Sequence, residues 1–213
     1  MTVKGIVFDL DGVICFTDKY HFQAWIEQME KINIKIPKET LTKLCGVSRQ
    51  VGLDIILQDA NVSLTQEQKD KICIEKNERY IKLLENMSEK DVDEDVLYTL
   101  KTLKNKNIKI AIGSGSRNAK TVLKKIGLYD MFDAIIDGSM INNSKPNPEV
   151  FLKASQAINV NPKECIVVED ATSGIDAANT GGFYSVGINS AYDYKKAKYK
   201  IKKLSELLEI ISK

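Results

Sequence analysis

The sequence predicts an α/β fold, with a Rossmann-like parallel sheet core, helices on both faces and an inserted α-helical cap domain. Three observations lead to this prediction. A continuous apolar run at residues 5–8, typical of a strand buried on both faces, stops at two aspartates. Residues 18–86 then carry helical signals without a convincing strand. From residue 91 onward helical and strand patterns alternate, as in chains that form parallel sheets.

The helical insertion follows the first strand directly. The first expected helix runs from residue 17 or 18 to 29, and a short second helix, after a break at 33–37, ends at residues 45–46. The third runs from 49 toward 60 and the fourth from 66 to 84. Gly46 is the stop signal of the second, short helix, and Ser48 can cap the third. Thr65 and Gln68 have the spacing of a capping box, which opens the long helix. Residues 16–87 are therefore assigned to the cap domain.

Residues 1–15 and 88–213 are assigned to the α/β core. Leu97, Leu100 and Leu103 have the spacing of one apolar helix face. Further helices are expected at residues 118–126, 147–158, 173–179 and 204–211, and strands at 108–112, 134–137, 165–168 and 184–188. Asn147 and Pro148 supply a cap and a first-turn proline for the helix that ends at 158. Together with the first strand, these segments predict a sheet of five parallel strands.

Length and composition set the broad class of protein. The 213 residues are enough for one large domain or a domain with an insertion, and 43% hydrophobic residues can build a real core. A net charge of +2 argues against a dedicated nucleic-acid binder. Lysines with interleaved tyrosines gather at residues 192–203. This stretch is either a surface for an anionic partner or, as we favour, a solvated face before the last helix.

The cysteines and the apolar runs indicate the compartment. Cys15, Cys45, Cys73 and Cys165 are scattered without zinc-site spacing, and the single histidine, His21, gives cysteine catalysis little support. No apolar run approaches a membrane span, and the first one is too short for a signal peptide. We therefore expect a cytoplasmic protein without membrane or nucleic-acid partners, and a monomer.

Two aspartates stand where the first strand ends. Asp9 and Asp11 are spaced i, i+2, so on an extended segment their side chains point to the same side. Two carboxylates about 4–6 Å apart repel by roughly 3–4 kcal/mol at an effective dielectric constant near 20. A bound cation, most simply Mg²⁺, or a proton held by one of the two would offset this repulsion. The alternative is a solvated turn, because Asp and Gly are ordinary turn residues.

Three further features follow later strands. Residues 113–118 form a small-residue turn before a helix, which suits a phosphate group, although a flexible turn with a helix cap is an equal alternative. Lys145 precedes a proline, which holds it extended and can point it into a site, although a loop lysine is more often solvated. Glu169 and Asp170 end a strand, where acids can also serve as helix caps. Ligands of open α/β sheets bind at these carboxyl ends.

The order of these features resembles a known family. A strand-end Asp-x-Asp, a turn with Ser114, a lysine and a strand-end Glu-Asp follow one another along the chain. This set resembles the haloacid dehalogenase superfamily, whose four motifs have these residue types in this order. Within it, the insertion is similar to that of the β-phosphoglucomutases, chiefly in the stretch 46–49 (Gly-Val-Ser-Arg) and in the helix with His21 and Trp25. The resemblance spans nearly the whole chain.

The resemblance implies roles in the core. Asp9 would be the nucleophile that becomes an aspartyl phosphate, and Asp11 the general acid/base for a sugar hydroxyl. Mg²⁺ would be held by the Asp9 side chain, the Asp11 backbone carbonyl, Glu169 and Asp170. Ser114, the Gly115 N–H and Lys145 would bind the transferring phosphoryl oxygens.

It also implies a reaction and its substrate residues. The expected activity interconverts β-D-glucose 1-phosphate and glucose 6-phosphate through a glucose 1,6-bisphosphate intermediate. The second phosphate would bind Arg49, Ser116, Arg117 and Asn118. Gly46, Val47 and Ser48 would line the sugar, Thr17, His21 and Lys76 would couple closure of the cap to placement of Asp11, and Trp25 is either a substrate residue or a packing residue.

Two departures and two alternatives accompany this expectation. Phe16 stands where the family pattern has an acid, which affects the hydrogen bonds expected at the hinge, and Arg117 stands where lysine is usual. The first alternative is a sugar-phosphate phosphatase of the same fold, in which water accepts the phosphoryl group. The second is a non-catalytic binding protein, which is disfavoured because every motif acid, serine and lysine is present.

Overall fold

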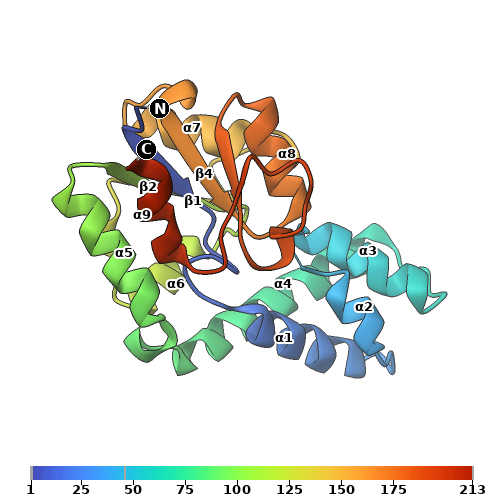
Figure 1. The fold of residues 1–213 in the computed structure, drawn as a ribbon. Coiled ribbons are helices and arrows are strands. Elements are labelled where there is room, and N and C mark those ends of the chain that lie inside the picture. Colours follow the sequence, from blue (N-terminus) through green and yellow to red (C-terminus); the bar gives the residue numbers. More distant parts are fainter. Residues whose placement is uncertain (1, 46, 213) are drawn as a thin grey trace. The chain divides into compact units, whose positions relative to one another are not determined.

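The chain consists of two compact units. The computed structural model describes residues 2–45 and 47–212 (Figure 1). The core unit comprises Met1–Phe16 and Ser88–Lys213, and the helical unit comprises Thr17–Met87. The assignment of the helical unit to substrate specificity and closure stays a prediction.

The core unit contains a parallel sheet in the order β3-β2-β1-β4-β5-β6. Its strands are β1 (Gly5–Phe8), β2 (Lys109–Gly113), β3 (Ala134–Ile136), β4 (Cys165–Glu169), β5 (Tyr184–Gly187) and β6 (Tyr199–Lys200). β1 lies between β2 and β4, with Val7 opposite Ala111 on one side and Val167 on the other. The predicted α/β fold is confirmed.

The expected number of five strands is wrong, because β6 adds a sixth. A two-residue strand is too short to leave a pattern of alternating side chains, and β6 lies inside the lysine-rich stretch. Lys200 is exposed on this edge strand, where a charge discourages pairing with another chain. The neighbouring lysines are exposed as well, and Lys198 and Lys202 lie over tyrosine rings.

Helices cover both faces of the sheet (Figure 1). They are α5 (Glu94–Asn105), α6 (Ala119–Lys125), α7 (Glu149–Ala157), α8 (Thr172–Thr180) and α9 (Leu207–Ile211). Val7, Ala111 and Val167 pack with α7 and α8, whereas Ile6 and Phe8 point to the opposite face, where α5 packs on β2 and on α9. The apolar character of β1 on both faces follows from this double covering.

Short 3₁₀ turns join these elements. They are η1 (Leu84–Asn86), η2 (Glu89–Asp91), η3 (Tyr129–Met131), η4 (Pro162–Glu164), η5 (Asn189–Ala191) and η6 (Leu204–Glu206). The last expected helix therefore begins with a 3₁₀ turn. Pro148 is the cap of α7 rather than a residue of its first turn, and Asn147 accepts a hydrogen bond from the Glu149 N–H. On α5, Leu97 is only half-buried and Val96 joins Leu100 and Leu103 on the buried face.

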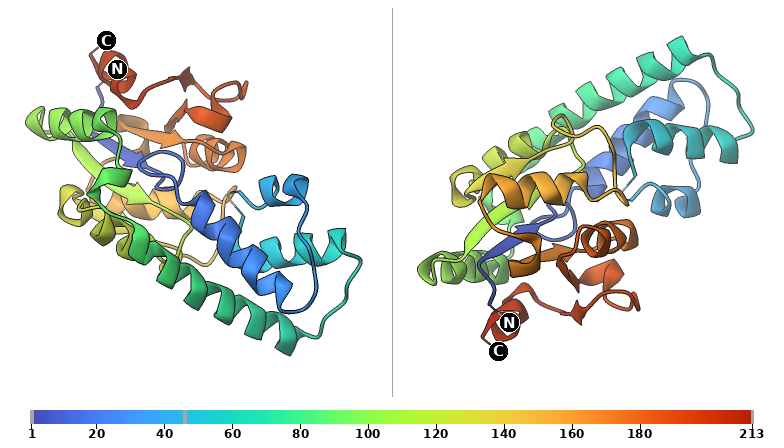
Figure 2. Two further views of the ribbon diagram at one scale, coloured as in Figure 1. Left: turned by 90° about the horizontal axis from the view of Figure 1, so that it is seen from below. Right: turned by 90° about the horizontal axis from the view of Figure 1, so that it is seen from above.

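The helical unit contains α1 (Asp18–Glu30), α2 (Lys38–Thr42), α3 (Arg49–Asp59) and α4 (Gln66–Leu83). α1 lies along α4 (Figure 2). Trp25, Met29, Leu53 and Ile56 belong to the buried cluster between the helices. No helix among the described residues is long and apolar enough to cross a membrane.

The helix starts of this unit follow the sequence closely. Ser48 accepts a hydrogen bond from the Val51 N–H, and the capping box of Thr65 and Gln68 is complete. The α2 helix ends at Thr42, earlier than expected, because the N–H groups of Lys43 and Leu44 bond carbonyls three residues back and tighten the chain into a 3₁₀-type turn. Gly46, the expected stop signal, lies outside the described residues.

Candidate active site

Asp9 and Lys145 form the centre of the site in the core unit. The Asp9 N–H donates to the Val168 carbonyl at 3.0 Å, which continues the β1–β4 pairing by one residue and places Asp9 at the carboxyl edge of the sheet. The Lys145 ammonium lies 2.5 Å from Asp9 Oδ1 and 2.5 Å from Glu169 Oε1. The ring of Phe151, on α7, is 4.6 Å from the same ammonium. Lys145 therefore bridges two buried carboxylates from neighbouring strands.

Four acidic groups gather at this edge, and the pKa values of two of them are raised. Burial raises the pKa of Asp9 to about 7, and Glu169 and Asp11 add to the effect while Lys145 opposes it. Burial, Glu169 and Asp9 likewise raise the pKa of Asp170 to about 8. Burial works against the charged form of Lys145, but Asp9 and Glu169 outweigh it and raise its pKa. The Lys145 ammonium thus pairs with Asp9 and Glu169, while Asp11 and Asp170 add two further acidic groups to the same edge.

Glycines bring these acids close to the backbone. Gly12 has a φ of +79°, and a Cβ at this position would lie 2.2 Å from Asp170 Oδ2. At Gly174, on α8, a Cβ would lie 1.9 Å from Glu169 Oε1. The Ala171 N–H donates to Glu169 Oε2 at 2.6 Å. Asp170 consequently packs against the turn after β1, and Glu169 against the start of α8.

The carboxylates suit a hard cation by their chemistry. Carboxylate and carbonyl oxygens are the ligands that Mg²⁺ prefers. Burial is the main cause of the raised pKa values of Asp9 and Asp170, and the acidic neighbours that also raise them are charges that such an ion would offset. Within the described ranges, no three acidic, histidine or cysteine side chains are placed so as to hold a metal ion together. The donor types fit Mg²⁺, with Lys145 placed between two of them.

The turn after β2 is organised by its serines. Ser114 is buried and its hydroxyl accepts from the Ser116 N–H at 3.1 Å, while the Ser116 hydroxyl accepts from the Asn118 N–H at 3.2 Å. Gly115 is exposed, and a Cβ there would meet nothing within 4 Å. Arg117 is exposed as well. The turn therefore presents backbone and hydroxyl groups at the same sheet edge as Asp9.

The segment after β3 supports this turn, a role that was not predicted for its residues. The Gly138 N–H donates to the Ser116 carbonyl at 3.1 Å, and a Cβ at Gly138 would lie 2.1 Å from the Gly115 carbonyl oxygen. Asp137 accepts from the Ser139 N–H at 2.9 Å. A glycine directly after an expected strand was the available signal, since it often marks close backbone approach.

In the helical unit, the half-buried His21 pairs with the buried Lys76. The Lys76 ammonium donates to His21 Nδ1 at 2.8 Å, and the His21 ring stacks on Tyr80 with centroids 3.9 Å apart. Burial lowers the pKa of His21, and the charges of Lys76 and Arg49 lower it further, so the neutral ring accepts the hydrogen bond. Trp25 lies 5.1 Å from the Lys76 ammonium and is 3% exposed, inside the apolar cluster.

Arg49 extends from the start of α3 to α4. Its guanidinium donates to Asn77 Oδ1 at 2.6 Å and to the Cys73 carbonyl at 3.3 Å. Val47 is exposed, and Thr17 is buried with its carbonyl accepting from the Tyr20 N–H. Arg49, Lys76 and His21 thus gather in this unit, whereas the motif residues from 9 to 11, 114 to 118, 145 and 169 to 170 belong to the core unit. Gly46 lies outside the described residues.

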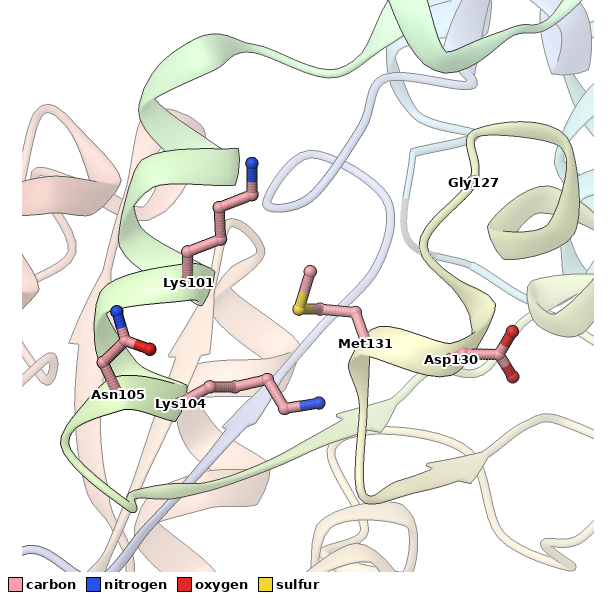
Figure 3. Close-up of a pocket in the computed structure, with 6 residues that line it drawn as sticks. All are labelled: Lys101, Lys104, Asn105, Gly127, Asp130 and Met131. Atoms are coloured by element: carbon pink, nitrogen blue, oxygen red, sulfur yellow. The ribbon is translucent and has the colours of Figure 1, made fainter.

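A separate cavity of about 390 Å³ lies in the core unit (Figure 3). Lys101, Lys104 and Met131 extend into one space, while Asp130 points away from it. The cavity is lined by the end of α5 and the segment before β3, which places it toward the amino ends of β2 and β3. It belongs to the opposite edge of the sheet from Asp9 and carries no candidate nucleophile in its lining.

Fold and site together define a Rossmann-like α/β protein with an acidic site at the carboxyl edge of its sheet and a helical unit inserted after β1. The model of the haloacid dehalogenase-like hydrolases matches residues 3–182, and the chain belongs to this family.

Individual relatives differ in their reactions. The chain is 35% identical to a β-phosphoglucomutase of Bacillus subtilis, over 98% of this chain and 94% of the relative. A crystal structure of β-phosphoglucomutase from Clostridium difficile superposes with a TM-score of 0.91 and 37% identity, covering 99% of this chain and 96% of the other. A phosphatase of phosphorylated carbohydrates from Thermotoga maritima is 28% identical, over 84% of this chain and 82% of the relative.

Proposed function

We propose that this protein is a Mg²⁺-dependent β-phosphoglucomutase that interconverts β-D-glucose 1-phosphate and glucose 6-phosphate. The observation that carries the proposal is the bridge from Lys145 to Asp9 and Glu169, because it places a cation against the buried carboxylate that would accept the phosphoryl group. The similarity to the Bacillus subtilis mutase over nearly the full length supports the mutase reaction.

The proposed chemistry has two matched transfers. In the first, a carboxylate oxygen of Asp9 forms a bond to phosphorus of glucose 1,6-bisphosphate, the bond from phosphorus to the sugar oxygen breaks, and Asp11 donates a proton to that oxygen. In the second, a sugar hydroxyl of the monophosphate gives its proton to Asp11 and takes the phosphoryl group from Asp9. The sugar phosphate must bind in two orientations for the phosphate to move between carbon 1 and carbon 6.

Residues of the core unit would stabilise the transfer. Lys145, Ser114 and the Gly115 N–H would donate to the phosphoryl oxygens, where charge spreads during transfer. Asp9, the Asp11 carbonyl, Glu169 and Asp170 would hold Mg²⁺, which supplies charge neutralisation between nucleophile and phosphate. The raised pKa values of Asp9 and Asp170 support this in part, since the acidic neighbours add to the larger effect of burial and a cation would offset both.

The helical unit would bind the phosphate that does not react. Arg49 stands in the first turn of α3, where the helix dipole disfavours a cation, so a bound anion is a reason for an arginine at this position. Ser116, Arg117 and Asn118 would contribute from the core unit. Val47, Ser48 and Gly46 would line the sugar, and Thr17, His21 and Lys76 would couple closure to catalysis.

The second candidate is a sugar-phosphate phosphatase, which the similarity to the Thermotoga maritima enzyme favours. In that reaction water replaces the sugar as the acceptor, and the acids of the core unit serve both reactions alike. A monomeric, cytoplasmic enzyme is proposed in either case.

The experiment that tests the proposal compares activation by bisphosphate. Turnover of β-glucose 1-phosphate with Mg²⁺ is followed by a coupled assay for glucose 6-phosphate and by an assay for inorganic phosphate. A mutase requires a trace of glucose 1,6-bisphosphate and produces glucose 6-phosphate. Phosphate release that is independent of the bisphosphate would assign the protein as a phosphatase.

A further inference from the structure

Asn189 lies after β5, a strand that carries none of the family motifs, and it contacts the turn that follows Asp11. It follows β5 as the first residue of η5, and its side-chain amide donates to the Gly12 carbonyl at 2.7 Å. The two residues are 177 positions apart. The position is exposed, yet its amide reaches the turn that carries Asp11.

The turn at Gly12 is held from two sides. Within the turn, the Gly12 N–H donates to the Cys15 carbonyl at 2.8 Å, and the Leu10 carbonyl accepts from the Ile14 N–H at 3.0 Å. On one side Gly12 packs directly against the Asp170 carboxyl group. On the other side its carbonyl accepts from Asn189. The amide thus fixes the peptide immediately after Asp11.

The residue type suits both tasks of this position. Asn189 has a φ of +50°, a left-handed conformation that asparagine and glycine adopt more readily than other residues. Only asparagine of these two also carries an amide donor. The preceding Ile188 N–H donates to the Glu169 carbonyl at 3.0 Å, which anchors the segment beside the acids of β4. Asn189 therefore joins the ends of β4 and β5 to the turn after β1.

We propose that Asn189 is a positioning residue, which holds the Asp11–Gly12 turn against Asp170 and thereby fixes where Asp11 gives and takes its proton. The inference rests on the proposed function, in which Asp11 is the general acid/base. Loss of the amide lets the Gly12 peptide rotate, so Asp11 loses its alignment with the sugar oxygen. Transfers that need no proton from Asp11 keep their rate.

The test uses two phosphoryl donors and a matched glycine control. Acetyl phosphate releases acetate, a weak base that leaves without a proton, whereas the sugar oxygen needs one. Asn189→Gly keeps the left-handed backbone and removes only the amide. Asn159→Gly makes the same change in an exposed turn after α7, where φ is +55°. Asn189→Asp replaces the donor by an acceptor and serves as the second variant.

We expect Asn189→Gly to lower kcat with β-glucose 1-phosphate by roughly tenfold or more, the scale of a small misplacement, with KM nearly unchanged. In the same variant, phosphorylation of Asp9 by acetyl phosphate, measured by intact mass, keeps the wild-type rate. Asn189→Asp should show the same loss of kcat and the same rate of phosphorylation. Asn159→Gly keeps both activities. Equal kcat in Asn189→Gly and wild type would overturn the inference, as would parallel loss of both activities. Absence of phosphorylation in the wild type would instead overturn the proposed function and the inference with it.

Discussion

Lys145 and Asp9 are 136 positions apart in the chain, and the ammonium of one lies 2.5 Å from a carboxylate oxygen of the other. Both side chains are buried, so the pair lies in surroundings where an unpaired charge is costly. Lys145 also contacts Glu169, so a single ammonium is shared between two acidic side chains.

Asp9→Asn should abolish phosphorylation of the protein by acetyl phosphate, because an amide is a very poor nucleophile. The fold should persist, since asparagine has the same size and removes a buried charge. Intact mass spectrometry with acetyl phosphate and circular dichroism provide the measurements. The control is Asp133→Asn. Asp133 lies away from the motifs and accepts a hydrogen bond from the Ile110 N–H, so this variant should be phosphorylated normally. Phosphorylation of Asp9→Asn at the native rate would show that another residue is the nucleophile.

Stability of the metal-free protein should depend on the two raised carboxyl groups. Their pKa values in the folded protein, about 7 for Asp9 and about 8 for Asp170, exceed the ordinary aspartate value of 3.8. The stabilising contribution of each is therefore present below about pH 4 and is lost as the pH rises through the folded pKa. Between about pH 5 and pH 8, the thermal midpoint should fall less in Asp9→Asn than in wild type.

Mg²⁺ should reverse this loss, because it binds the deprotonated carboxylates. The rise in thermal midpoint on adding Mg²⁺ should be larger at about pH 8 than at about pH 6. Asp170→Asn should reduce that rise and shift the metal titration to higher concentration, since it removes a charged ligand. Equal shifts at both pH values, with an unchanged titration in Asp170→Asn, would contradict the assignment of these acids as ligands.

Gly12→Ala should damage the site beyond its effect on the backbone. The matched control is Gly182→Ala, because Gly182 has a φ of +80° and open space where a Cβ would stand. The control should lose about 1–2 kcal/mol of unfolding free energy from the left-handed conformation alone. Gly12→Ala carries the same strain and also meets the Asp170 carboxyl group, so it should lose activity as well. Denaturant unfolding and turnover separate the two effects, and equal activity in both variants would argue against the contact.

Arg49→Ala should affect the mutase reaction more than simple phosphorylation. Removal of the guanidinium should cost about 2–4 kcal/mol of transition-state stabilisation with β-glucose 1-phosphate, on the scale of a desolvated charge pair. Acetyl phosphate has no second phosphate, so phosphorylation of Asp9 should be spared. Arg79→Ala, which removes another cation of the helical unit that pairs with Glu27, is the control. Equal loss of both activities in Arg49→Ala would make Arg49 structural, and full mutase activity would place the second phosphate elsewhere.

The sequence predicted the parts of this structure that leave a local pattern. The apolar run before Asp9, the capping box of Thr65 and Gln68 and the Ser48 cap each depend on a few adjacent residues. Because parallel strands end at one edge, Asp9 and Glu169, which follow two of them, were expected at the same edge of the sheet. The β6 strand was not predicted, because a strand of two residues is too short to show alternating buried and exposed side chains.

Contacts between distant residues could not be predicted in the same way. Nothing near Lys145 in the sequence indicates that it bridges Asp9 and Glu169, since the bridge depends on how the loop before α7 folds back over the sheet. The packing of Asp170 on Gly12 and the amide of Asn189 likewise depend on the spacing of β1, β4 and β5. These supports are properties of the packed sheet edge rather than of any motif.

The most direct test of the central claim is ³¹P NMR of the wild-type protein with β-glucose 1-phosphate, Mg²⁺ and a trace of glucose 1,6-bisphosphate. The proposed mutase predicts that the glucose 1-phosphate signal is replaced by glucose 6-phosphate, with a small, steady bisphosphate signal and little inorganic phosphate. The same sample with Asp9→Asn should stay unchanged. Inorganic phosphate that grows in step with the loss of glucose 1-phosphate, without glucose 6-phosphate, would contradict the claim and identify water as the acceptor.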